Sequence, residues 1–428
     1  MTGAQPGRLL VIGFSTVMAR GLQLFRPDDS VIFLEEAGLA RDRDAVTFLA
    51  DYPCCSRLVE WDYLHPDAAD EFFAAGALGE RPAAIVPGME HATAFAARLA
   101  ERYGLPTATL GAAELMRDKA RLRRVTAAAG VPNPVSRSVE GPAEVVALLR
   151  ELGAPVIVKP SNRAGSAGVT RVDSPEQATA AFGFALTGGE SEPQREWGDG
   201  GEVLVEEYLA GPEFSVEMLV EDGRPVLGNI TAKTLFDGPR PIERGHVLPH
   251  SGPEAEEMLA LTGRVVAATG FAAGIVHCEW IVTDRGSVLV ECAGRIPGDG
   301  ITALLGIGWG VDWVEQYVAL MSGRLDRQLL PDQPVRSSAV ALAAAEPGTV
   351  LAIDGLDRAG AIEGVLVVLP LVSVGDEVRP LRSSADRVAL AISMGADPAE
   401  ATARAEQAIA LVRVRTGADQ PVSSSVTT

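Results

Sequence analysis

The chain has 428 residues, of which 47% are hydrophobic and 22% are charged, a composition typical of soluble globular proteins with roughly two to four domains. Its formal net charge of −20 argues against nucleic acid as a partner, because such binding relies on clustered Lys and Arg, although a local basic pocket could still hold a nucleotide. The four cysteines show no zinc or disulfide spacing and no stretch could span a membrane, so we expect a cytoplasmic protein with no membrane partner.

Residues 8–110 alternate apolar strand-like runs with helical ones. The strand predictions are Arg8–Gly13, Ser30–Leu34 and Ala83–Val86, and the helix predictions are Asp67–Ala77 and His91–Tyr103. This alternation predicts a small α/β domain with Rossmann-like winding. The glycine after the first strand lacks the G-x-G-x-x-G spacing, so we infer no dinucleotide site.

Residues 111–131 are predicted to form one helix closed by Gly130. Lys119 and three nearby arginines make this helix basic in an otherwise acidic chain. Such a run is usually a solvated helix face.

The stretch Val156–Val172 predicts a strand that ends in Lys159, a small-residue loop over Ser161–Gly168, and a second strand. Gly165 and Gly168 let backbone N–H groups approach an anion, and Lys159 can reach the same phosphates. The alternative is a plain hairpin turn. We expect an exposed, mobile loop over Thr187–Gly201.

Glu202–Val220 predicts two strands joined through Glu206–Pro212. In the second strand Glu213, Ser215 and Glu217 share one face. The unpaired backbone groups of the connector could bind an adenine edge, and Glu213 could accept hydrogen bonds from ribose. A half-buried strand with its polar residues outward explains the pattern equally well.

The segment Ile230–His250 has no sustained periodicity but is dense in Lys, Glu, Arg and His. We expect an irregular loop of about twenty residues, a length that is often functional inside a compact domain. Ordinary surface histidines are the alternative.

The stretch Ile275–Gly300 predicts a hairpin whose strands, His277–Val282 and Ser287–Glu291, close symmetrically about Arg285. Glu279 and Glu291 then lie opposite each other inside apolar strands, where an unpaired carboxylate is costly. A cation such as Mg²⁺ between them relieves this repulsion, and Arg295 beside a helix start favours an anion. The alternative is a surface hairpin with both glutamates facing solvent. Cys278 and Cys292 point to the opposite face and are predicted to be core residues.

From Pro331 onward a further domain is predicted, with strands at Ser338–Ala344 and Ile362–Leu369 and a helix at Pro398–Val412. We find no catalytic constellation in it.

Two lysines, a small-residue loop, a carboxylate-bearing connector, a glutamate pair and an arginine follow one another in this order. Over roughly residues 110–325 the chain therefore resembles the ATP-grasp superfamily of carboxylate–amine ligases. The resemblance implies an α/β (α+β) protein with a Rossmann-like pre-ATP-grasp domain (1–110), an ATP-grasp domain (111–330, with a lid subdomain over about 133–207) and a C-terminal domain (331–428).

The resemblance also implies roles for individual residues. Those implied to bind ATP are Lys119 and Lys159 at the phosphates, Ser161, Gly165, Ser166 and Gly168 in the loop above them, Glu206, Glu207 and Leu209 around adenine (Glu206 and Leu209 largely through main chain), and Glu213 at the ribose. Glu279 and Glu291 would bind Mg²⁺, with Mn²⁺ as the alternative, and Arg295 would hold the transferred phosphoryl group and the reacting carboxylate. The superfamily often has Asn two residues after the second glutamate, where this chain has Ala293.

Glu243-x-x-His246, together with Glu291-x-x-x-Arg295, looks most like the L-amino-acid (dipeptide-forming) ligase branch. The implied reaction forms an amide from a carboxylate and an amine, both small molecules such as amino acids, through an acyl phosphate, with ADP and phosphate as products. Glu243 or His246 could orient the amine or accept its proton. The resemblance further implies a homodimer. Alternatives are a carboxylase-like or purine-pathway enzyme, and a nucleotide-binding regulatory protein without turnover.

Overall fold

The computed structural model describes residues 7–188 and 201–417. In this part of the chain no helix is both long enough and apolar enough to cross a membrane. Most of the loop predicted at Thr187–Gly201 falls outside the described residues.

The N-terminal unit is built on a parallel sheet of order β3-β2-β1-β4. Its strands are β1 (Leu9–Ile12), β2 (Val31–Glu35), β3 (Cys55–Glu60) and β4 (Ala84–Pro87), and its helices are α1 (Thr16–Gln23), α2 (Ala37–Asp42), α3 (Ala45–Ala50), α4 (Ala68–Ala74) and α5 (Thr93–Tyr103). Strands β1, β2 and β4 are buried along their length, which explains their continuous apolar sequences. The predicted parallel strands are confirmed, and β3 adds a strand that the sequence analysis missed.

Two helices, α6 (Leu110–Met116) and α7 (Lys119–Ala128), replace the single predicted helix. The prediction was wrong because Asp118 ends the run: its side chain accepts a hydrogen bond from the Arg121 amide and caps α7. The cap turns the first residues of α7 toward the interior. Lys119 and Arg123 are buried, so the solvated-face interpretation fails for them, whereas Arg121 is exposed.

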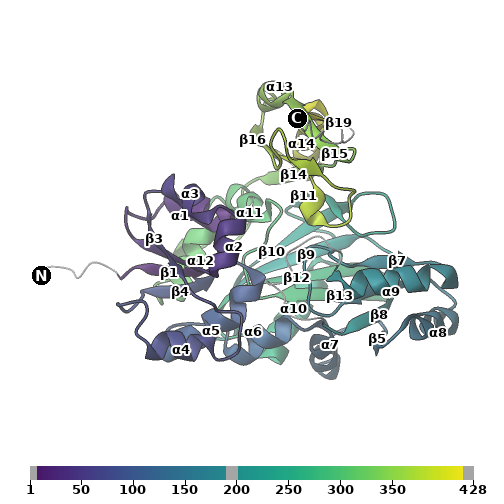
Figure 1. The fold of residues 1–428 in the computed structure, drawn as a ribbon, viewed down its shortest axis with the longest axis horizontal. Coiled ribbons are helices and arrows are strands. Elements are labelled where there is room, and N and C mark those ends of the chain that lie inside the picture. Colours follow the sequence, from purple (N-terminus) through teal and green to yellow (C-terminus); the bar gives the residue numbers. More distant parts are fainter. Residues whose placement is uncertain (1–6, 189–200, 418–428) are drawn as a thin grey trace, which may run out of the picture.

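A second, smaller sheet of order β5-β8-β6-β7 has its own apolar core and lies at the far end of the molecule from the N-terminal unit (Figure 1). Its elements are β5 (Ser136–Val139), β6 (Val156–Pro160), β7 (Thr170–Val172), β8 (Val203–Glu207), α8 (Pro142–Leu152) and α9 (Ala178–Leu186). We call this sheet with its two helices the lid sheet.

The central sheet is antiparallel, has eight strands and runs in the order β13-β12-β9-β10-β11-β14-β18-β16. Its strands are β9 (Glu213–Glu221), β10 (Arg224–Leu235), β11 (Glu243–Leu248), β12 (Gly274–Thr283), β13 (Gly286–Ala293), β14 (Ser337–Ala343), β16 (Val365–Pro370) and β18 (Ala389–Gly395). Residues after Pro331 thus continue the sheet that carries the hairpin, so hydrogen bonds cross the predicted boundary at 330.

Helices pack on this sheet and join it to the N-terminal unit. They are α10 (Ala255–Thr269), α11 (Ile301–Trp309), α12 (Trp313–Met321), α13 (Leu356–Gly360) and α14 (Pro398–Leu411), and a small sheet of β15 (Gly348–Asp354), β17 (Glu377–Val378) and β19 (Arg413–Gly417) completes the described chain. One apolar core includes Val11 of β1, Trp313 of α12 and Ile275 of β12. The N-terminal unit and the central sheet therefore share a core, whereas the lid sheet has a separate one.

Candidate active site

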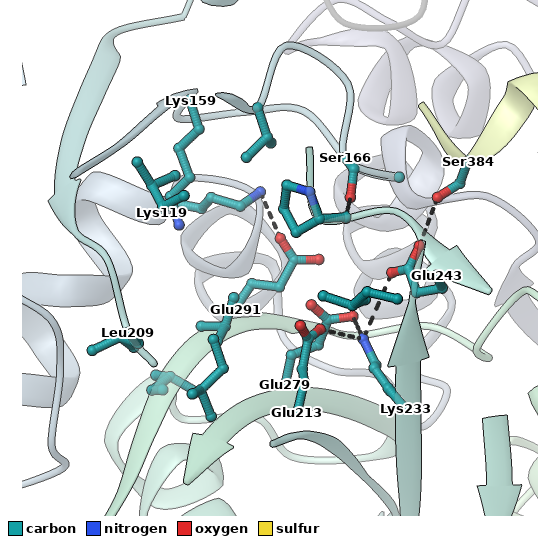
Figure 2. A pocket seen from close by; sticks show the side chains of 18 of the residues that line it. Lys119, Lys159, Ser166, Leu209, Glu213, Lys233, Glu243, Glu279, Glu291 and Ser384 are labelled. Carbon is teal, nitrogen blue, oxygen red and sulfur yellow. Dashed lines mark hydrogen bonds and ion pairs between the residues drawn. The ribbon is translucent and has the colours of Figure 1, made fainter. Parts of the chain in front are cut away.

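A cavity of about 250 Å³ lies between the lid sheet and the central sheet. The predicted site residues that line it are Lys119, Lys159, Gly165, Ser166, Glu206, Glu207, Leu209, Glu213, Glu243, His246, Glu279, Glu291 and Arg295. Figure 2 shows ten of the lining residues by name. Ser161 and Gly168 lie just outside this lining: the Ser161 carbonyl accepts a hydrogen bond from the Lys119 amide, and Gly168 packs against Pro160.

The hairpin places Glu279 and Glu291 at paired positions, but not by the expected symmetric closure. Thr283 pairs with Gly286, so the turn contains two residues, and a bulge at Val290 then shifts the register so that Glu279 faces Glu291. Both carboxylates line the cavity, which contradicts the alternative of a solvent-facing pair. Cys278 and Cys292 are buried on the other face, as predicted.

Each of these two carboxylates contacts a lysine ammonium group. Lys119 Nζ lies 2.9 Å from Glu291 Oε2, and Lys233 Nζ forms a short ion pair with Glu279 Oε1 (Figure 2). Burial alone would lower the pKa of Lys119, but Glu291 and Glu90 outweigh it and raise that pKa. The wall of the cavity thus alternates buried positive and negative charges.

Lys233 is a site residue that the sequence analysis did not select. Its ammonium group lies among three carboxylates, 3.1 Å from Glu213 and 3.8 Å from Glu243 as well as against Glu279, and the oxygens of these three lie within 4.8 Å of one another. Burial, reinforced by the charges of Glu279 and Glu243 and opposed by Lys233, raises the pKa of Glu213 to about 7. The predicted ribose contact of Glu213 stays a prediction.

The prediction of an irregular loop at Ile230–His250 was wrong. Strands β10 and β11 pair across most of it, with Lys233 opposite His246, and only residues 236–242 connect them. Glu243 and His246 are therefore fixed on a strand. Buried polar side chains interrupt the apolar alternation that would otherwise have indicated strands.

Lys159 belongs to a buried ion-pair group with Glu206 and Arg123. Lys159 Nζ lies 2.6 Å from Glu206 Oε2, and Arg123 donates two hydrogen bonds of 2.9 and 3.1 Å to the same carboxylate. Burial would raise the pKa of Glu206, but the two cations outweigh it and hold that pKa well below its usual range. Burial, aided by Arg123 and Lys119, lowers the pKa of Lys159 despite Glu206. The side chain of Glu206 is thus occupied, Glu206 also pairs with Ser136 and Ile157 in the lid sheet, and its predicted adenine contact stays a prediction.

Glu207 and Leu209 lie at the end of β8, where the chain crosses to the central sheet. The Glu207 carboxylate accepts hydrogen bonds from Val135 N at 3.2 Å and Arg285 Nη2 at 2.8 Å. Leu209 offers an apolar side chain to the cavity. The predicted adenine contacts of Glu207 and Leu209 stay predictions.

The phosphate loop between β6 and β7 has three residues in the left-handed region, Gly165 (φ +63°), Ser166 (φ +57°) and Gly168 (φ +74°). Glycine adopts this conformation without strain, whereas Ser166 holds it with a hydrogen bond of 2.6 Å from its hydroxyl to the Pro241 carbonyl. The Gly165 carbonyl accepts a hydrogen bond of 3.0 Å from the Ser384 amide. The loop is therefore fastened across the cavity.

Arg295 and His277 complete the wall. Arg295 donates hydrogen bonds of 3.1 and 2.9 Å to Glu90, a residue of the N-terminal unit that the sequence analysis missed. His277 pairs with Ala293 and contacts the carboxylates of Glu217 and Glu279 at 3.0 and 3.3 Å. Burial would lower the pKa of His277, but these two carboxylates raise it to about 9. A cationic imidazole thus lies across the hairpin from the position where the resemblance implies Asn.

Glu243 and His246 face a different part of the wall. The Ser384 hydroxyl donates a hydrogen bond of 2.8 Å to Glu243 Oε2. Both ring nitrogens of His246 are buried without a hydrogen-bond partner among the described residues, and Nε2 lies 3.8 Å from Asp299 Oδ2. His246 thus lines the cavity with Asp299 as its ion-pair partner.

Comparisons with known proteins agree with this arrangement. Residues 152–303 match the ATP-grasp domain, and residues 340–417 match the L-amino acid ligase C-terminal domain 2. The sequence is 30% identical over 327 residues to an uncharacterised protein, y4rH, of Sinorhizobium fredii (72% of this chain, 66% of that protein). It is 29% identical over 335 residues to a phosphoribosylamine–glycine ligase of Leifsonia xyli (73% of this chain, 77% of that protein).

The crystal structure of an L-amino acid ligase from Bacillus licheniformis superimposes with a TM-score of 0.77 at 18% identity, over 97% of this chain and all of that one. The predicted ATP-grasp fold is confirmed. The roles predicted for individual site residues stay predictions.

Proposed function

We propose that this chain, which belongs to the ATP-grasp superfamily, is an ATP-dependent ligase that joins a carboxylate and an amine, with amino acids as substrates. One observation carries the proposal: Glu279 and Glu291 face one cavity in which Lys119, Lys159, Lys233 and Arg295 supply the cations that a triphosphate and a carboxylate need. A carboxylate is a poor electrophile, and phosphorylation gives it a leaving group.

The donor set fits a divalent cation, for which we propose Mg²⁺. Glu279 and Glu291 offer only oxygen ligands, and Mg²⁺ prefers one or two carboxylates together with phosphate oxygens. Their present contacts with Lys233 and Lys119 show that the wall stabilises positive charge at these positions. When bound, the metal ion would neutralise charge on the β- and γ-phosphates.

In the first step a carboxylate oxygen of one substrate attacks the γ-phosphorus, the bond to the β-γ bridging oxygen breaks, and ADP leaves. Lys159 and Arg295 screen the charge that develops. Glu206 and Glu90 hold these two cations in place, which removes the need to order them during the reaction.

In the second step the amine nitrogen attacks the acyl-phosphate carbon, phosphate leaves, and the nitrogen gives up a proton. Glu243 and His246 both line the cavity, and either could accept that proton. The fastened phosphate loop would exclude water, which otherwise hydrolyses acyl phosphates.

The test combines the protein with Mg-ATP and pairs of amino acids. We expect amide products in equal amounts with ADP and phosphate. AMP with pyrophosphate would contradict the acyl-phosphate route, bicarbonate-dependent ADP release without an amine would favour a carboxylase, and ATP binding without turnover would favour a regulatory protein. We also propose a homodimer, which light scattering after size-exclusion chromatography tests.

A further inference from the structure

The segment Ser383–Arg387 brings the C-terminal part of the chain into the wall of the cavity. Its short helical turn, η6 (Ser384–Asp386), precedes β18, and Ser384 lines the cavity. The Ser384 hydroxyl holds Glu243, while the Ser384 amide holds the phosphate loop at Gly165. Ser384 thus contacts both the loop that is predicted to cover the nucleotide and Glu243, the carboxylate that is predicted to face the amine.

Arg387 makes a denser set of contacts. Its guanidinium group donates two hydrogen bonds to the Asp299 carboxylate, one of 3.1 Å from Nη1 and a shorter one from Nη2. It also donates to the Glu243 carbonyl at 3.3 Å and the Ser384 carbonyl at 2.7 Å. Two such hydrogen bonds from one guanidinium group, a fork, fix the orientation of a carboxylate, and the positive charge stabilises the carboxylate in its ionised form.

Asp299 is the residue that this fork orients. It has φ +55°, in the left-handed region that residues other than glycine rarely adopt. Burial would raise the pKa of Asp299, but Arg387 outweighs it and lowers that pKa. The oriented carboxylate lies 3.8 Å from Nε2 of His246.

We propose that Ser384 and Arg387 are positioning residues for the amine half-reaction: they hold Glu243 and Asp299 in the cavity wall that also contains His246, so that an incoming ammonium group meets two fixed carboxylates. The inference rests on the proposed ligase function and assigns part of that site to the C-terminal part of the chain. Among the described residues, the hydrogen bonds of these two side chains reach Glu243, Asp299 and the Ser384 carbonyl and none of the residues predicted to bind phosphate or metal, which makes the two half-reactions separable by experiment.

The experiment compares two nucleophiles that attack the same acyl phosphate. Amide formation needs the amine substrate in its site, whereas hydroxylamine at high concentration attacks directly and gives a hydroxamate. For Arg387→Gln we expect kcat/KM for the amine to fall on the order of 10²-fold, the cost of a misplaced reacting group, while hydroxamate formation changes less than threefold. Arg387→Lys, which keeps the charge but not the fork, should lie between parent and Arg387→Gln.

Ser384→Ala keeps the backbone and removes only the hydroxyl, so we expect a loss of about threefold to tenfold in kcat/KM for the amine. If the Arg387 variants do not fold, the result for Ser384→Ala alone tests the positioning role. Arg404→Gln is the matched control, because Arg404 also lies in the C-terminal part and bonds to a carbonyl, Met394 O, but does not line the cavity. It should leave both products unchanged.

The outcomes separate the two proposals. A parent protein that makes neither hydroxamate nor amide contradicts the proposed function. A parent that makes both, with variants that lose both equally or neither, overturns the positioning role. A larger loss for amide than for hydroxamate in Arg387→Gln and Ser384→Ala supports it.

Discussion

The two sides of the cavity are built differently. On the side that holds the residues predicted to bind phosphate and metal, which we call the phosphate side, Lys119 pairs with Glu291, Lys159 with Glu206, and Glu279 with Lys233, all between residues 119 and 291. On the amine side, Glu243 and Asp299 are fixed by a segment about 90 to 140 residues further along the chain. Apart from Arg295, which pairs with Glu90, the residues predicted to act in phosphoryl transfer are thus held within one region, whereas those proposed to position the amine are held by another.

The largest expected effect tests whether the phosphate side is held by its own ion pairs. Arg123→Met leaves Glu206 paired with Lys159 alone, and breaking a buried pair by removing one partner costs about 3–5 kcal/mol. Urea unfolding measures this free energy. Arg121→Met, on the exposed face of the same helix, should change it by less than about 0.5 kcal/mol. Equal effects of the two changes would contradict the difference between the two sides.

The next effect concerns turnover on the same side. Glu291→Gln keeps the shape but removes a charge that faces Lys119 and Glu279, and we expect ATP-dependent amide formation to fall on the order of 10²–10³-fold. Glu221→Gln, on β9 of the same sheet but not lining the cavity, is the matched control. Full ADP release by Glu291→Gln would contradict the proposed metal site and with it the ligase assignment.

His277 lies next to the phosphate side and should make stability depend on pH. Its pKa is about 9 in the folded protein and near 6.5 when unfolded, so between these values the folded state keeps a proton that the unfolded state releases. The resulting stabilisation, on the order of 3 kcal/mol, is complete below about pH 6.5 and is lost as the pH rises through about 9. Unfolding at several pH values should show this slope in the parent and in His65→Gln, an exposed control, but a weaker one in His277→Gln.

The smallest expected effect tests whether the side chain of Glu207 belongs to the nucleotide site. Arg285→Ala removes the exposed ion pair with Glu207, which should change the free energy of unfolding by about 0–1 kcal/mol. Because the side chain of Glu207 is directed to Arg285 and Val135, we expect KM for ATP to stay within about twofold. A large rise in KM would mean that the Glu207 side chain, rather than the backbone, binds the nucleotide.

Short sequence patterns were enough to predict the pairing of the hairpin and the position of the loop on the phosphate side. The pairing of Glu279 with Glu291 follows from a short hairpin, although a two-residue turn and a bulge produce it instead of symmetry about Arg285. Gly165 and Gly168 indicated the loop that is predicted to lie over the phosphates, because residues other than glycine rarely adopt the left-handed backbone found at both positions. Such features are set by neighbours in the sequence, which is why one sequence suffices.

Long-range contacts could not be predicted in this way. Ser384 meets Glu243 across 141 positions and Arg295 meets Glu90 across 205, and nothing in the local sequence encodes such a partner. Lys233 was missed for a related reason: β10 and β11 bury charged residues at a functional site, so their pattern departs from that of ordinary strands. The break between α6 and α7 depends on a single cap, Asp118.

The continuous central sheet also determines which part of the molecule can move. Hydrogen bonds join each strand to its neighbour from β13 to β16, so the hairpin and the C-terminal strands belong to one continuous sheet. The lid sheet, by contrast, joins α7 through residues 129–135 and the central sheet through residues 208–212, two short connections that both contain proline. Nucleotide exchange would then require the lid to swing about these two points and the Ser384–Gly165 hydrogen bond to break, while the residues facing the amine keep their places.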